Sequence, residues 1–527
     1  MPLRELLSRG YFPKELPAPF ITDNFSALLT STATPPGDFG KKVKKGVKIP
    51  TAKACKYSLA RGGLLRRQLS ICNPVLFYLL SKEITDNWSK ILPHVAGTPL
   101  AATAPEFKPT GRAINGKHPQ DARSKLAQDT RLGKRFLLST DISRFYHSIY
   151  THSIPWALHT KPTAKANHTF RLLGNKLDYL VRQGQDGQTV GIPIGPDTSL
   201  VLAELIMHKC DEALIRKLPT IKGHRFIDDY ELSFSTRTEA EDAFHILETC
   251  LSDFELALNP KKTHVAELPL PLEAAWALQI KKFSFRTTKT GQASDLETFF
   301  SLAFELHNSN HGEPVLQFAI ARLRFMTVDS NNWELFQRLI LLCITPEPAA
   351  LPYALELIIS RVNAGAIPLK PQIEEIINDL VVNHAPLRHS SEVANSLWAC
   401  LALKLTLHDN AVDNISNCED SSVALLALDC QNKGLLSKPL DTTQWETYME
   451  ANGLYDEHWL LSYEANIKGW LPNVGGVDHV AADSNFGFLK ANSVHFYDEH
   501  LASAANNAPI PMPKLPSVFT SSSNQSI

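Results

Sequence analysis

The sequence predicts an α+β fold in which an antiparallel sheet backed by helices is followed by an all-α, HEAT-like helical repeat domain. Three observations support it: short apolar strands alternate with helical segments up to residue 267, prolines cluster at 268–272, and nearly everything beyond has helical apolar spacing. We therefore expect a first domain over 1–267 and a helical repeat domain over 268–503. A chain of 527 residues, 44% of them hydrophobic, is long enough to build two such cores.

The first predicted element is a β-hairpin. Over residues 42–72, short apolar stretches alternate with basic residues and with Gly62-Gly63, and Asn73-Pro74 then opens a helix. The formal net charge of -1 hides an uneven distribution, because residues 41–67 contain no Asp or Glu. Such a basic run favours an anionic partner, and the alternative interpretation is a solvated surface.

Two later segments place carboxylates at strand ends. A predicted strand over 135–140 ends at Asp141, and a predicted hairpin carries Asp228-Asp229 at its tip. An Asp-Asp pair alone more often caps a helix or fills a turn. Carboxylates that converge from different strands, however, are what nucleotidyl transfer requires to hold two divalent cations.

Helical segments alternate with these strands. We predict a loop and a helix over 108–135, helix over 154–181, a turn followed by a helix over 193–213, and an amphipathic helix over 239–257. This alternation is typical of an antiparallel sheet backed by helices.

Beyond residue 268, a short strand over Phe283-Ser284-Phe285 precedes helices that recur in pairs about every forty residues, which suggests a HEAT-like array. The apolar runs with helical spacing are residues 315–326, 333–344, 355–362, 373–382 and 393–407. Residues 504–527 are rich in Pro, Ser and Asn, so we expect a disordered tail.

Four motifs, in this order, resemble those of reverse transcriptases. Asp141 with Phe145-Tyr146 resembles the first catalytic motif, and residues 191–199 (GIPIGPDTS) resemble the loop that holds template and nucleotide. Phe226-Ile227-Asp228-Asp229 matches the aromatic-x-Asp-Asp box, and residues 259–263 (NPKKT) fit the Asn-x-x-Lys-Thr motif. Together they are far more specific than any one alone.

The resemblance implies the fingers and palm of a right-hand polymerase over 1–267. It further implies nucleotidyl transfer from deoxynucleoside triphosphates with two Mg²⁺ ions, Mn²⁺ being the alternative. The predicted catalytic residues are Asp141, Asp228 and Asp229, of which Asp229 assists more through hydrogen bonds than by direct ligation. The predicted metal ligands are Asp141, Ile142, Asp228 and Asp229.

The resemblance also suggests which residues contact the nucleotide. Tyr146 lies where the family keeps an aromatic ring below the sugar, and Lys262 is placed to contact the triphosphate or to protonate pyrophosphate. The plainer interpretations are a core tyrosine and a helix-end charge. The other predicted nucleotide-binding residues are Lys56, Arg66, Arg67, Gly191 and Pro193.

Within reverse transcriptases, residues 146–158, Gly195-Pro196 and residues 15–20 resemble the bacterial Abi-type abortive-infection enzymes. That resemblance implies anti-phage defence, a helical C-terminal domain in place of an ordinary thumb, and a homo-oligomer. It also implies template-independent synthesis primed by a tyrosine, so that single-stranded DNA becomes attached to one of the 12 tyrosines.

Two other functions stay open. A conventional RNA-templated reverse transcriptase, of the retron or group II intron kind, would need a thumb and a duplex-binding surface. A catalytically silent module that binds nucleic acid or a phage protein would not need Asp141, Asp228 and Asp229.

Other sequence features exclude several classes of protein. The eight cysteines are scattered, with no Cys-x-x-Cys and no paired histidine spacing, so neither a zinc site nor a disulfide framework is indicated. No segment is long and apolar enough to cross a bilayer, and the first ten residues lack a signal-peptide core. We therefore expect a cytoplasmic protein without a membrane partner.

Overall fold

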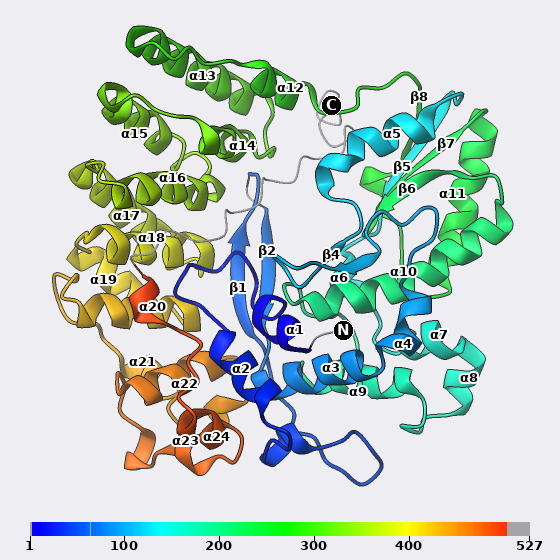
Figure 1. Ribbon diagram of the computed structural model, residues 1–527, viewed down its shortest axis with the longest axis horizontal. Coiled ribbons are helices and arrows are strands. Elements are labelled where there is room, and N and C mark those ends of the chain that lie inside the picture. Colours follow the sequence, from blue (N-terminus) through cyan, green and yellow to red (C-terminus); the bar gives the residue numbers. More distant parts are fainter. Residues whose placement is uncertain (1–2, 64, 503–527) are drawn as a thin grey trace.

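The computed structural model of the protein describes residues 3–63 and 65–502, and helices predominate in it (Figure 1). The predicted first hairpin is present as β1 (Cys55–Ala60) and β2 (Arg66–Ile71), which pair antiparallel. A second small pair is formed by β3 (Pro105–Phe107) and β4 (Ile114–Gly116). The predicted tail over 504–527 lies outside the described residues.

The largest described sheet has four antiparallel strands in the order β6-β7-β5-β8. The strands are β5 (Phe136–Asp141), β6 (Lys222–Phe226), β7 (Asp229–Phe234) and β8 (His264–Glu267). Helix α11 (Arg237–Ser252) packs against β5 and β7, and α10 (Asp197–Lys217) packs against α11. The antiparallel sheet backed by helices is therefore confirmed.

The segment predicted as helix over 154–181 contains three helices. The chain turns at Thr160, which has a φ of 70°, and Pro162 opens the next helix. The remaining helices of this part of the chain are α1 (Leu3–Arg9), α2 (Asp23–Ser31), α3 (Pro74–Asp86), α4 (Trp88–Ile91), α5 (Arg123–Arg131), α6 (Phe145–Ser148), α7 (Ser153–His159), α8 (Lys161–Ala166) and α9 (Leu173–Gln183).

After β8 the described chain is helical. Helices α14, α16, α18, α20 and α22 contact one another in series, as do α13 with α15 and α17 with α19. These helices form a stacked column (Figure 1). Their bounds are α12 (Ala275–Lys282), α13 (Lys289–Ser309), α14 (Val315–Arg322), α15 (Trp333–Leu341), α16 (Leu351–Asn363), α17 (Lys370–His384), α18 (Ser390–Leu403), α19 (Asp409–Ser416), α20 (Ser421–Asn432), α21 (Thr443–Glu446), α22 (Trp459–Lys468), α23 (His479–Ala482) and α24 (Phe486–Ala491). That the column is a HEAT-like repeat stays a prediction.

The strand predicted at Phe283-Ser284-Phe285 is wrong. The segment pairs with no strand of the described residues, and both of its aromatic rings pack on Phe299 of α13, with ring centroids 5.2 and 5.1 Å away. Alternating aromatic residues are typical of a strand, but here burial against a helix satisfies them.

The buried apolar side chains divide into two cores. One core contains side chains of residues 84–258 and Leu6. The other joins side chains of residues 7–79 to those of residues 274–502 and includes Leu180. Hairpin β1–β2 therefore shares its core with the helical column, and it stands between this column and the four-stranded sheet (Figure 1).

Polar contacts join the hairpin to the column as well. The backbone N–H groups of Ser58 and Ala60 donate to the hydroxyls of Ser390 and Ser391, at 2.8 and 2.9 Å. The indole of Trp459 donates to the carbonyl of Ile71 at 3.0 Å.

All eight cysteines are buried with free thiols. Among the described residues, no helix combines the length and the apolarity that crossing a bilayer requires.

Candidate active site

The structure brings the three predicted catalytic carboxylates together at one end of the four-stranded sheet. Asp141 is the last residue of β5 and Asp229 the first of β7, and they lie opposite each other in the antiparallel register. Asp228 lies in the turn between β6 and β7, and its carbonyl accepts the N–H of Ile142 at 3.2 Å. The four predicted metal ligands are therefore neighbours.

The turn that carries Asp228 is strained. Ile227 has a φ of 57°, a left-handed conformation that costs a β-branched residue about 1–2 kcal/mol. Its N–H donates to the hydroxyl of Thr103 at 2.8 Å, and its carbonyl accepts from Nη1 of Arg225 at 2.7 Å. These two hydrogen bonds hold the strained residue and thereby fix the position of Asp228.

A buried ion cluster lies beside this turn. The guanidinium of Arg225 is fully buried and donates to Glu204 at 2.9 and 3.0 Å and to Asp211 at 2.8 Å. The hydroxyl of Tyr230 donates to Asp211 at 2.7 Å. Since both acids come from α10, the cluster joins this helix to the turn. Sequence reasoning missed it, although an arginine next to the Asp-Asp box and two acids seven residues apart on a helix were visible signals.

Asp141 is a buried carboxylate with a shifted pKa. Its side chain is buried, and Nζ of Lys262 lies 2.9 Å from its Oδ2. Burial raises the pKa of Asp141, Lys262 acts in the opposite direction, and Asp229 raises it further, so that the pKa lies above its ordinary value. Two facing carboxylates, one of them buried, form a donor set that suits a hard divalent cation such as Mg²⁺.

Asp229 has a positively charged partner of its own. Nη2 of Arg123, on α5, lies 3.2 Å from Oδ2 of Asp229, and its guanidinium lies 4.7 Å from the centre of the Phe226 ring. Sequence reasoning missed Arg123. The basic excess over residues 108–135 was the only signal that pointed to this segment.

Tyr146 and the predicted nucleotide loop lie side by side. The N–H of Ile192 donates to the carbonyl of Tyr146 at 2.9 Å, and Gly191 adopts a φ of 89° that favours glycine. Burial, and then the charge of Asp228, raise the pKa of the Tyr146 hydroxyl.

The same loop reaches the first hairpin. The N–H of Ser70 on β2 donates to the carbonyl of Ile194 at 2.8 Å. Pro193, a predicted nucleotide-binding residue, lies between these two attachments. The loop therefore connects Tyr146 to the hairpin.

The predicted basic residues of the hairpin face two ways. Arg66 makes a bidentate ion pair with Glu392 of α18, at 2.6 and 2.8 Å, and Lys56 pairs with Glu457 at 3.1 Å. Both side chains are thus directed at the helical column, and the structure does not bring them to the carboxylates. Arg67 has the opposite orientation, as the alternation of a strand requires, and its charge acts on Tyr146.

Arg61, which precedes the Gly62-Gly63 turn, is a basic residue that sequence reasoning missed. Desolvation and the neighbouring Arg67 lower the pKa of Arg61, whereas Asp228, Asp229 and Asp141 raise it. The charges of all three carboxylates therefore act on Arg61, whose side chain is exposed.

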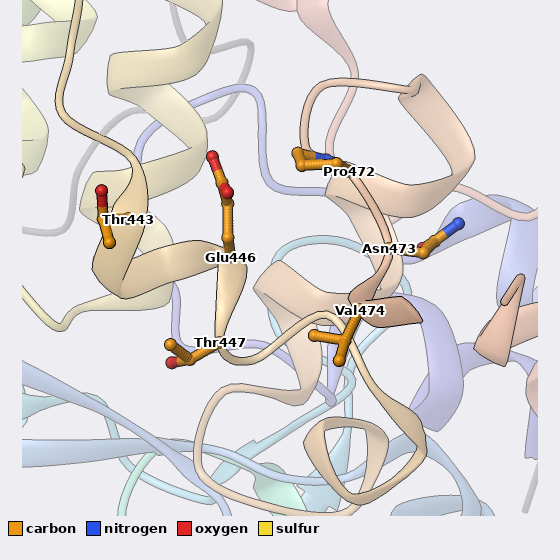
Figure 2. Close-up of a pocket in the computed structure, with 6 residues that line it drawn as sticks. All are labelled: Thr443, Glu446, Thr447, Pro472, Asn473 and Val474. Atoms are coloured by element: carbon orange, nitrogen blue, oxygen red, sulfur yellow. The ribbon is translucent and has the colours of Figure 1, made fainter. Parts of the chain in front are cut away.

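Two surface pockets lie in the helical column. One, of about 390 Å³, is lined by His408, Asp409, Asn410 and Ser437. The other, of about 260 Å³, is lined by Thr443, Glu446, Thr447, Pro472, Asn473 and Val474 (Figure 2). Neither includes a predicted site residue, so neither bears on the carboxylate site.

The comparisons agree with this geometry. Residues 71–290 match the family model described as "Reverse transcriptase (RNA-dependent DNA polymerase)", and the match includes all four motifs. The chain therefore carries a reverse transcriptase domain. It is an enzyme of the RNA-directed DNA polymerase-like nucleotidyltransferase class.

Solved structures that resemble the chain include two telomerases. Apo telomerase from Candida tropicalis has a TM-score of 0.33 and 11% identity, over 64% of this chain and 69% of that one. Telomerase from Candida albicans, in complex with a TWJ fragment of telomeric RNA, has a TM-score of 0.29 and 11% identity, over 72% of this chain and 62% of that one. No curated protein sequence matches the chain. Both similarities are weak.

Proposed function

We propose that this enzyme is a DNA polymerase of anti-phage abortive infection that works without a template and is primed by one of its own tyrosines. The convergence of Asp141, Asp228 and Asp229 beside the strained turn carries the polymerase part of the proposal. The resemblance of residues 146–158 to Abi-type enzymes supports the defence role. We further propose a homo-oligomer that carries single-stranded DNA as its product.

The proposed reaction joins a hydroxyl oxygen to the α-phosphorus of a deoxynucleoside triphosphate and releases pyrophosphate. Two Mg²⁺ ions, or Mn²⁺, would be held by Asp141, Asp228 and the backbone of Ile142, and would supply charge neutralisation and an activated hydroxyl. Arg123 keeps Asp229 oriented. Lys262 and Arg61 bring positive charge to the same place, where a triphosphate needs it.

Tyr146 is proposed to select the sugar. Its backbone is fixed to the nucleotide loop through Ile192, and its ring lies near Asp228. An aromatic ring held in this way would collide with a ribose 2′-hydroxyl, and deoxynucleotides would then be preferred.

The helical column supports synthesis without a template. In the Abi-type plan a helical domain replaces the thumb, and here the column shares a hydrophobic core with hairpin β1–β2. The second candidate is RNA-templated synthesis, which is favoured by the family model's own description as an RNA-dependent polymerase.

Burial narrows the search for the priming tyrosine. All 12 tyrosines lie among the described residues, and seven of them are buried. A hydroxyl that receives a nucleotide must be reachable, so the buried tyrosines are poor candidates. Tyr455 is kept as a candidate, although its hydroxyl donates to Asp483 and accepts from Asn485. The five half-buried candidates are Tyr146, Tyr150, Tyr179, Tyr448 and Tyr455.

The test is to incubate the purified protein with labelled deoxynucleotides and Mg²⁺, without template or primer, and to separate it on a denaturing protein gel. We expect label that migrates with the protein in the wild type and in the control Asp242→Asn, an exposed residue of α11. We expect none in Asp228→Ala. One Tyr→Phe substitution among the five should abolish the protein-bound label.

Two outcomes would contradict the proposal. Label that requires added RNA would establish templated synthesis. The absence of label with and without RNA, in a folded protein, would favour a silent binding module.

A further inference from the structure

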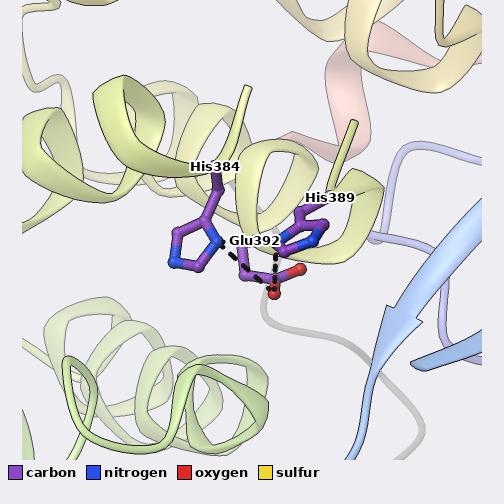
Figure 3. Close-up of side chains that lie close together, drawn as sticks. All are labelled: His384, His389 and Glu392. Atoms are coloured by element: carbon purple, nitrogen blue, oxygen red, sulfur yellow. Dashed lines mark hydrogen bonds and ion pairs between the residues drawn. The ribbon is translucent and has the colours of Figure 1, made fainter. Parts of the chain in front are cut away.

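A cluster of metal-ligating side chains lies in the helical column, at the turn between α17 and α18. His384 is the last residue of α17, His389 lies in the connection, and Glu392 is in the first turn of α18 (Figure 3). Each of them offers one ligand atom, and these atoms lie within 4.8 Å of one another.

The three atoms have the spacing of ligands around one ion. Nδ1 of His384 and Nδ1 of His389 are 2.9 Å apart, and each lies 3.7 Å from Oε1 of Glu392. A circle through three atoms at these distances has a radius of about 2.0 Å, which is the length of a Zn–N or Zn–O bond. An ion at this distance from all three atoms would lie in their plane, so tetrahedral coordination requires the two imidazoles to move apart and Glu392 to approach them, by about 0.4 Å each.

We propose that His384, His389 and Glu392 bind a zinc ion. Two imidazoles with one carboxylate are a donor set that zinc commonly takes, whereas Mg²⁺ prefers oxygen ligands alone. The side chains of His384 and His389 are 18% and 22% exposed, so that water can reach the fourth position. Glu392 is buried, which makes its position well defined.

The ion pair with Arg66 is compatible with this site. A carboxylate oxygen accepts two partners, so Oε1 of Glu392 can accept Nη1 of Arg66 at 2.6 Å and still ligate an ion. Ligating carboxylates usually carry such a second hydrogen-bond partner, which holds them in position. Ser391 and Nη2 of Arg66 occupy the other oxygen, Oε2, at 2.7 and 2.8 Å.

A zinc ion at this turn would strengthen the attachment of hairpin β1–β2 to the helical column. The same turn of α18 accepts the backbone N–H groups of β1 through Ser390 and Ser391, and it holds β2 through Arg66. Zinc at this turn would fix Glu392, and Glu392 in turn holds Arg66 of hairpin β1–β2. The proposed zinc site contains none of the proposed catalytic carboxylates, so it is independent of the proposed polymerase function.

The competing explanation is a direct hydrogen bond between the two imidazoles, for which 2.9 Å is an ordinary distance. Metal content separates the two. The full-length protein is dialysed against metal-free buffer, incubated with zinc sulfate in the presence of excess Mg²⁺, freed of unbound metal and analysed by mass spectrometry for zinc.

We expect one zinc per chain in the wild type and at least a tenfold lower content in His384→Ala/His389→Ala. His311→Ala/His408→Ala removes two exposed histidines of the same half and should keep the ion. Asp228→Ala should keep it too, since it alters only the polymerase site. In the wild type, cobalt in place of zinc should give the visible absorption of a tetrahedral site with nitrogen ligands.

The milder variant His389→Gln guards against misfolding of the double variant, and circular dichroism checks both. Removal of zinc should lower the Tm of the wild type and leave that of His389→Gln unchanged. Zinc content in the folded wild type no higher than in His389→Gln would overturn the proposal and leave the hydrogen bond as the explanation.

Discussion

The two hydrophobic cores hold their parts of the molecule by different means. The core around the four-stranded sheet contains a fully buried ion cluster, in which Arg225 binds two acids of α10 beside the turn of Asp228. The other core is dominated by large apolar side chains, among them the fully buried Trp276, Trp398, Trp445 and Trp459. The first core positions a few charged groups beside the turn, and the second buries the larger number of apolar side chains.

The candidate site draws on both cores. Asp141, Asp228 and Asp229 belong to the sheet, whereas Arg61 and Arg67 are presented by a hairpin whose core is that of the helical column. The carboxylates and their partners Arg123 and Lys262 thus depend on the first core, whereas the charges of Arg61 and Arg67 depend on the second. Substitutions should separate the two contributions.

The largest effect is expected from Arg225→Met, which leaves two buried acids without their counter-ion. We expect a loss of about 3–5 kcal/mol in the free energy of unfolding of the sheet region and a loss of activity. Denaturant unfolding measures the first and nucleotide incorporation the second. The triple variant Arg225→Met/Glu204→Gln/Asp211→Asn should recover part of the stability, because no unpaired charge remains. A wild-type unfolding curve for the single variant would contradict the role of the cluster.

The next comparison sets Arg61→Ala against Arg66→Ala. The charges of the carboxylates act on Arg61, which is proposed to bring positive charge to the triphosphate. Its loss should therefore raise the KM for deoxynucleotide about tenfold without a change in Tm. Arg66 is bound to Glu392, so its loss should lower the free energy of unfolding by about 1–3 kcal/mol and leave the KM nearly unchanged. Kinetics and thermal unfolding of both variants test this. The reverse pattern would show that Arg66, and not Arg61, serves the nucleotide site.

A smaller effect is expected from Asp141→Asn in metal-free buffer. The pKa of Asp141 is raised in the folded protein, so its ionised form costs stability above the ordinary pKa of an aspartate, and acidification relieves this cost. The variant should therefore gain about 1–3 °C in Tm at neutral pH and lose this advantage near pH 4. Calorimetry at both pH values measures it. A lower Tm for the variant at neutral pH would contradict the sign.

The smallest effect on stability is expected from Ile227→Gly. Glycine relieves the strain of the left-handed residue, by about 1–2 kcal/mol, but it loses packing and makes the unfolded chain more flexible. The free energy of unfolding should thus change by less than about 1 kcal/mol, whereas the turn of Asp228 gains freedom and kcat falls roughly threefold. Unfolding and single-turnover kinetics distinguish these effects. An unchanged kcat would mean that the strain plays no part in positioning Asp228.

Several predictions from sequence rested on local patterns and were confirmed. The strand that ends at Asp141 and the hairpin before and after Asp228 follow from alternation and turn residues within a few positions. So does the hairpin predicted over residues 42–72, although its strands span only residues 55–60 and 66–71. The strand at Phe283-Ser284-Phe285 failed because alternation alone does not say whether a strand partner or a helix covers the aromatic rings.

Local sequence patterns do not distinguish the roles of the basic residues of the hairpin. Arg66 and Arg67 are adjacent and chemically identical, and only the placement of the helical column decides that the first meets Glu392 and the second faces Tyr146. The candidate zinc ligands were missed for a related reason. His384, His389 and Glu392 come together only when the α17–α18 turn folds.

Short stretches of the chain are enough to predict the chemistry of this protein. Four short motifs supply the carboxylates, the aromatic residue and the lysine of a reverse transcriptase domain, and each motif depends on neighbours in the chain. The folded arrangement alone shows which charges meet and that residues 7–79 share a core with residues 274–502. Burial and ion pairing depend on contacts between segments that can lie hundreds of residues apart, and local sequence patterns do not encode such contacts.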